Sequence, residues 1–242
     1  MTSQTHSQRQ VSQEDRSAPP RRRRRRWIIA GATIAAGLVG LAAVAAVAVK
    51  PQPGAPPFVL STSATAPEGG ADGEWHSGAE STAGFRVRQT SFGAETDVVG
   101  RTNNVTGVAV ITGEQLTAAE FTLHLTTIQV NGKASPQFAT SVDSTAYPDA
   151  TFTLTAPQAG PTDINSGAIT TATLTGRLTL HGVTRPVALA VSARRTGNEL
   201  EVTGSVPITF TDWGIKAPRN YGSLGSLTDH GLAEFLLVLH RK

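Results

Sequence analysis

Short runs of alternating apolar and polar residues between positions 73 and 242 constrain the fold of this chain more than any other feature. Residues 121–126 and 151–154 alternate strictly, and Val187, Leu189 and Val191 share one phase of a further run. A period of two is typical of a β-strand that buries one face. Residues 73–242 are therefore predicted to form an all-β domain.

Turn-forming pairs separate these runs, among them Thr112-Gly113, Asn131-Gly132 and His181-Gly182. Apart from one short helical candidate within residues 135–144, no segment of this region has a helical period. The spacing predicts an extended antiparallel β-barrel or sandwich of about eight strands with one short helix. A barrel is favoured because a closed sheet has no exposed edge strand.

An uncharged apolar run at residues 27–49 predicts one transmembrane helix before this domain. A helix of that length spans roughly 35 Å, which exceeds a hydrocarbon core of about 30 Å. Arginines at 21–26 flank the run on one side only, and Trp27 occupies the position of an interfacial aromatic. By the positive-inside rule, residues 1–26 form a disordered basic cytoplasmic tail. The domain after this single-pass cell-membrane anchor is then extracytoplasmic.

Other interpretations of the N-terminal region stay open. Residues 43–45 loosely fit a signal-peptide cleavage site, although the apolar run is longer than a signal core and favours a retained anchor. The arginines also match a twin-arginine signal weakly. The glycines of the run do not form a clean GxxxG pattern, so the residues do not decide between a monomer and a homodimer.

Residues 50–72 contain many Pro, Gly and Ala residues. Such a composition supports neither a helix nor a central strand. We expect an extended, semi-rigid linker that holds the 73–242 domain off the membrane surface.

The distribution of charge argues against a nucleic-acid partner. The net charge is +3, but eight arginines and only two acidic residues lie within positions 1–26, whereas residues 51–242 hold twelve basic and sixteen acidic residues. The folded part is thus mildly acidic, unlike a nucleic-acid-binding surface. The chain has no cysteine, which excludes thiolate metal sites and a thiol nucleophile. Its six histidines show no metal-ligand spacing, so we expect no metal, no cofactor and no enzyme activity.

The inward phase of the predicted strands supplies the candidate cavity lining. A small barrel is either filled by side chains or holds one small ligand, and the many Thr, Ala and Val residues here favour some free space. The candidates are Phe85, Val87, Phe121, Leu123, Phe152, Leu154, Leu178, Leu180, Val206, Ile208 and Phe210. Each of them either contacts an apolar ligand or fills the core.

Four segments in order carry a family resemblance. They are Ser81-x-Ala83-x-Phe85-x-Val87-Arg88, Tyr147-Pro148-x-x-Thr151-Phe152, the LTLHGVTRPV stretch at 178–187, and Asp212-Trp213-Gly214-Ile215. Over residues 73–242 the chain resembles the YceI-like family of polyisoprenoid-binding proteins. The resemblance implies a lipocalin-like barrel whose long apolar cavity takes up a polyisoprenoid or an isoprenoid quinone. It also implies a bacterial extracytoplasmic location and no catalytic residues.

The motif residues have ordinary structural roles beside this resemblance. Gly182 and Pro186 are expected to set a turn between two strands, and Asp212 to cap the turn at Trp213 and Gly214. Trp213, like Trp75 at the start of the domain, is expected to plug the barrel rather than contact ligand.

Three polar residues are candidates for the cavity mouth or a ligand headgroup. Arg88 and Arg185 are surface charges by default, but either could neighbour a polar headgroup. Gln89 stands where many members of the family have a histidine, and an amide can hydrogen-bond but cannot titrate.

Two other functions compete with lipid binding. A filled β-barrel could act as a surface protein-interaction module without a lipid ligand. An enzyme using His181 or His76 is disfavoured, because the sequence shows no nucleophile or acid–base constellation.

Overall fold

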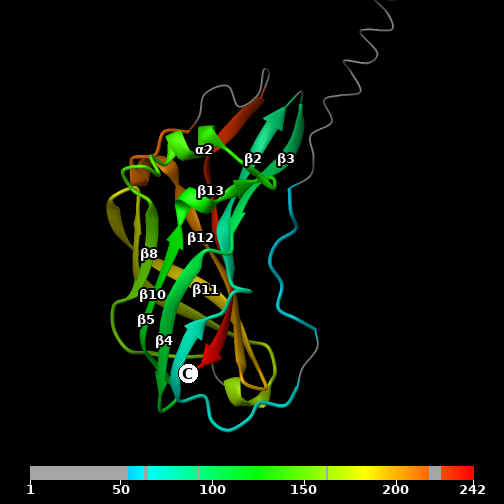
Figure 1. Ribbon diagram of the computed structural model, residues 1–242, viewed down its shortest axis with the longest axis vertical. Helices are drawn as coiled ribbons and strands as arrows, with labels where there is room; N and C mark the ends of the chain where they lie inside the picture. Colours follow the sequence, from blue (N-terminus) through cyan, green and yellow to red (C-terminus); the bar gives the residue numbers. More distant parts are fainter. Residues whose placement is uncertain (1–53, 63–64, 92, 162, 218–224) are drawn as a thin grey trace, which may run out of the picture. The chain divides into compact units, whose positions relative to one another are not determined.

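The computed structural model describes residues 54–62, 65–91, 93–161, 163–217 and 225–242, most of them in strands (Figure 1). The strands are β1 (Gly73–Ser77), β2 (Thr82–Ser91), β3 (Ala94–Thr102), β4 (Val105–Thr112), β5 (Gln115–His124), β6 (Gln129–Val130), β7 (Lys133–Ala134), β8 (Asp149–Leu154), β9 (Gln158–Ala159), β10 (Thr170–Leu180), β11 (Val183–Thr196), β12 (Glu199–Thr209) and β13 (Gly225–Arg241). The helical pieces are η1 (Leu125–Thr127), α2 (Pro136–Ser141), η2 (Ile164–Ser166) and η3 (Phe210–Trp213).

Eight of the strands close into an antiparallel barrel. They pair in the order β1-β4-β5-β8-β10-β11-β12-β13, and β13 returns to β1. The predicted all-β barrel with one short helix is therefore confirmed. The helix is α2, where Ser135 accepts a hydrogen bond from the Phe138 amide at 3.2 Å and Pro136 occupies the first turn.

The structure does not test the cytoplasmic tail and the transmembrane helix that the sequence predicts. Residues 1–26 and 27–49 lie outside the described residues. Within the described ranges, no helix combines the length and the apolar character needed to cross a membrane.

The long strand β13 joins the barrel to a second set of strands. Its end, Leu239–Arg241, pairs with β1, and its earlier part pairs with β2, from which β3, β6 and β7 continue (Figure 1). The β13–β2 register shifts between Leu227 and Gly231, which marks a β-bulge. The wall made by β13, β2 and β3 therefore contains one interruption of its hydrogen-bond ladder.

The turn between β10 and β11 has the conformation that its residues predict. His181 and Gly182 have φ values of 51° and 71°, as a two-residue type I′ hairpin requires. The turn prediction for Pro186 is wrong, because this proline lies inside β11 opposite Arg177. β11 pairs with β12 only from Ala190 onward, so Pro186 lies on a stretch of edge where a missing N–H costs no ladder bond.

Buried residues form two clusters, and each contains one tryptophan. Trp213 is 3% exposed in the cluster that also holds Val142 and Ile215, and Trp75 is fully buried in the cluster that holds Leu200 and Leu239. Trp75 also donates to the Ala71 carbonyl at 2.8 Å.

The predicted linker behaves differently from a free spacer. Its described part, residues 54–62 and 65–72, has no helix or strand and lies along the barrel (Figure 1). We call these residues the strap. Arg86 donates to the Ala55 carbonyl at 2.8 Å, and the Arg101 guanidinium lies 3.9 Å from the centre of the Phe58 ring. Leu60 of the strap is only 8% exposed. The segment is extended, as its composition predicts, but it is docked.

Candidate functional site

The barrel encloses an apolar cavity of about 310 Å³. Such a volume lies at the lower end of the range of small-molecule sites, roughly 300–1,000 Å³. Ten of the eleven candidate residues line it: Phe85, Val87, Phe121, Leu123, Phe152, Leu178, Leu180, Val206, Ile208 and Phe210. The alternation of the strands places nine of these side chains on one inner surface, and Phe210 follows β12 as the first residue of η3.

Leu154 does not line the cavity. It is the last residue of β8, pairs with Gly176 of β10, and packs against the buried cluster around Trp75. At the end of a strand, sharing the phase of Phe152 is therefore not sufficient to place a side chain in the cavity.

The sequence did not indicate one wall of the cavity, which α2 supplies. Phe138, Ser141 and Val142 line the space from this helix and its C-cap. The Phe138 ring stacks on Phe85 with centroids 5.0 Å apart and an interplanar angle of 13°. The Ser-Pro start of the helix was a usable signal for the element, but nothing local shows that Phe138 meets a strand residue 53 positions earlier in the chain.

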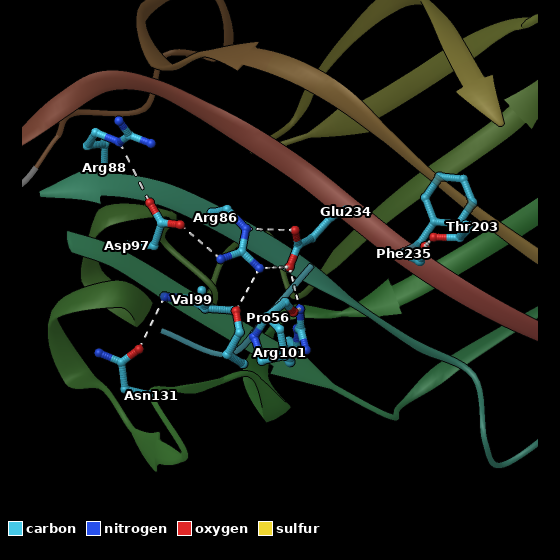
Figure 2. A network of polar contacts seen from close by, with 11 residues as sticks. Pro56, Arg86, Arg88, Asp97, Val99, Arg101, Asn131, Thr203, Glu234 and Phe235 are labelled. Carbon is cyan, nitrogen blue, oxygen red and sulfur yellow. Dashed lines mark hydrogen bonds and ion pairs between the residues drawn. The ribbon is translucent and has the colours of Figure 1, made fainter. Parts of the chain in front are cut away.

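Polar residues are few in the described lining, namely Glu114, Thr122, Ser141 and Glu234, and the Glu234 side chain shares the opposite face of the wall with Arg86. No lysine, arginine or histidine belongs to this set. The Glu234 carboxylate accepts from Arg86 Nε at 3.0 Å and from Arg101 Nη2 at 2.8 Å (Figure 2). Burial alone lowers the pKa of Arg86, but the ion pairs with Glu234 and Asp97 raise it above its ordinary value. The negative charge of Glu234 is therefore compensated by two guanidinium groups.

The three candidates for the mouth are not brought together at the cavity. Arg88 follows Val87 on β2, so its side chain points to the other face of the strand. There it is exposed and pairs with Glu95 at 3.0 Å. Arg185 donates from Nε to the Asp212 carbonyl at 2.7 Å. Gln89 is paired in register with Leu227, which lines the cavity, but Gln89 itself does not.

The sequence motifs pack against one another as a structural cluster. His181 Nδ1 lies 2.9 Å from the Trp213 carbonyl, and the Tyr147 ring meets the His181 ring edge-on at 4.9 Å. Gly214 ends η3 with a φ of 68°. Arg185 holds the same segment from β11 through Asp212, so the expected side-chain cap by Asp212 is replaced by its backbone carbonyl and an ion pair at 3.8 Å.

The histidines considered for catalysis lie apart from the cavity. Neither His181 nor His76 lines it, and His76 contacts Glu74 at 3.4 Å. His124 meets Asp149 at 2.6 Å on neighbouring strands β5 and β8. In the described part of the chain, no three His, Cys, Asp or Glu side chains are placed to hold a metal ion.

Fold and cavity together define the class of an eight-stranded antiparallel barrel with an apolar interior. The YceI-like domain matches residues 76–231, well over half of the chain. The chain belongs to the YceI-like family, as the sequence motifs predict. No curated protein matches it.

Several solved structures are similar to this chain, and the first named here shares its fold. A polyisoprenoid-binding domain from Saccharophagus degradans, implicated in plant cell wall breakdown, has a TM-score of 0.53 at 16% identity, covering 70% of this chain and 98% of that domain. Burkholderia cenocepacia BcnA gives 0.47 at 20% identity, covering 66% of this chain and 96% of BcnA. The Campylobacter jejuni YCEI protein gives 0.42 at 13% identity, covering 59% and 84%.

Proposed function

We propose that this protein binds one long, uncharged isoprenoid, a polyisoprenoid or an isoprenoid quinone, inside its barrel. The apolar cavity lined by ten predicted inward residues carries this proposal. Removal of the chain from water supplies the driving force, about 25 cal/mol for each Å² of apolar surface buried. Family membership and the fold shared with a polyisoprenoid-binding domain support the same ligand class.

The cavity lining also supports an uncharged ligand. An anionic headgroup needs cationic partners when it is desolvated. The described lining has none, and the Glu234 carboxylate points to the opposite face of the wall, where Arg86 and Arg101 bind it. An uncharged alcohol or quinone therefore fits better than a phosphorylated chain.

We further propose that the protein acts by binding and not by catalysis, because neither histidine considered for catalysis contacts the cavity. The uncharged run at residues 27–49 supports a membrane anchor with the barrel on the extracytoplasmic side. A filled interaction module is disfavoured, because the barrel has internal space.

A fluorescence titration with all-trans-retinol, an uncharged isoprenoid alcohol, tests the proposal. Leu178 lines the cavity, and Leu178→Trp fills part of it. Ile169→Trp adds the same ring at a position that is 56% exposed. We expect saturable binding by the parent chain and by Ile169→Trp, with a loss of at least about tenfold in Leu178→Trp. Absence of saturable binding in the parent chain, or equal affinities of both variants, would refute the proposal.

A further inference from the structure

Five arginines of the folded domain donate hydrogen bonds to main-chain carbonyl oxygens of the strap. These pairs are Arg86 with Ala55, Arg101 with Pro56, Arg194 with Ser61, Arg195 with Glu68 and Gly69, and Arg241 with Gly70. Charged donors make stronger hydrogen bonds than neutral ones. Phe58 adds a side-chain contact, since the Arg101 guanidinium lies 3.9 Å from its ring centre.

The contact between Arg86 and the strap lies on the outer face of the wall whose inner face lines the cavity. Arg86 stands between Phe85 and Val87 on β2, and both of these line the cavity. Across the sheet, Glu234 stands between Ala233 and Phe235, which also line it. The Arg86–Glu234 pair therefore ties together two strands whose neighbouring side chains form the cavity wall (Figure 2).

The same wall contains the interruption of the β13–β2 ladder. Pairing resumes at Gly231 opposite Val87, and the next pair joins Leu232 to Arg86. The ion pairs thus lie in the first paired stretch after the bulge. The strap limits their contact with water, since the side chains of Arg86 and Glu234 are only 11% and 6% exposed. Shielding of this kind strengthens an ion pair.

We propose that the strap and the Arg86–Glu234–Arg101 network beneath it form a clamp that keeps the β2–β13 wall closed and slows ligand exchange. This inference rests on the proposed binding function. The strap ends before residue 76, where the family match begins, so the clamp lies partly outside the matched region. Its predicted effect is on the rate of release, through the stiffness of the wall.

Two neighbouring strap residues provide a matched test in the full chain. Phe58→Ala removes the ring that stacks on Arg101, whereas Val59→Ala shortens a side chain that is 76% exposed. Each variant is loaded with all-trans-retinol and mixed with excess phosphatidylcholine vesicles, and the transfer rate is followed by fluorescence. Hydrogen exchange of β2 and β13 is measured on the same variants without ligand.

We expect Phe58→Ala to release retinol roughly two- to fivefold faster than the parent chain, as the loss of one cation–π contact suggests. We also expect faster exchange in β2 and β13 for this variant only. Equal release and equal exchange for both variants would overturn the clamp. If no chain binds retinol, the proposed function fails, while the exchange data still decide whether the strap stiffens the wall.

Discussion

Arg86 and Glu234 meet side-on on the barrel wall, with Nε–Oε2 at 3.0 Å and Nη2–Oε1 at 3.1 Å. Arg101 reaches the same carboxylate at 2.8 Å. Glu234→Gln leaves two guanidinium groups without their shared counter-charge, and we expect the free energy of unfolding to fall by about 3 kcal/mol. Urea denaturation of the full chain measures this change.

The control for this substitution is Asp229→Asn on the same strand. Asp229 pairs with His230 at 2.8 Å, but its side chain is 78% exposed, so we expect no measurable change in the free energy of unfolding. Similar losses for both substitutions would show that the network contributes no more than a surface pair.

Gly182 tests the motif cluster. Its φ of +71° already disfavours other residues, and an added Cβ would lie 2.5 Å from Tyr147 Cε1. Gly113 has a similar φ of +57° with open space around it. We expect Gly182→Ala to lower the melting temperature more than Gly113→Ala. The steric overlap with Tyr147 should lower the free energy of unfolding by about 1–3 kcal/mol more in Gly182→Ala. Equal melting temperatures would mean that Tyr147 moves aside freely.

Arg185 distinguishes a structural role from a headgroup contact. It bonds to the Asp212 carbonyl at 2.7 Å and does not line the cavity. We expect Arg185→Ala to cost about 1 kcal/mol of stability and to leave retinol affinity unchanged. A clear loss of retinol affinity in Arg185→Ala, with an unchanged free energy of unfolding, would contradict this prediction and place Arg185 at the ligand.

Headgroup charge provides a prediction that needs no substitution. Because no cationic side chain lines the described cavity, geranylgeranyl diphosphate must leave water without a partner for its phosphates. We expect it to compete with retinol at least about 100-fold more weakly than geranylgeraniol does. Equal competition would point to a cationic contact outside the described lining.

Alternation made the fold and most of the cavity predictable from sequence. A period of two determines which side chains share a face, and closure of the barrel places those faces inside. Leu154 marks the limit of this reasoning, since its phase is correct but its strand ends opposite Gly176. β13 was only partly visible, because residues 225–234 do not alternate strictly and contain the bulge.

The docking of the strap was not predictable in the same way. Its Pro, Gly and Ala residues indicate extended backbone, but the arginines that hold it bind main-chain carbonyl groups, which every residue carries. The mouth prediction stays untested for a related reason, although none of its three residues lines the cavity. Arg185 lies within a recognisable motif, but the sequence alone does not distinguish a partner in the ligand from one in Asp212.

Native mass spectrometry of the full chain, incubated with geranylgeraniol and compared with Leu178→Trp, tests most directly whether the cavity holds an uncharged isoprenoid. We predict a saturable one-to-one adduct of the parent chain that is lost in Leu178→Trp, whose new ring occupies the cavity. A bare protein mass at saturating geranylgeraniol, or an adduct that persists unchanged in Leu178→Trp, would contradict binding in the barrel.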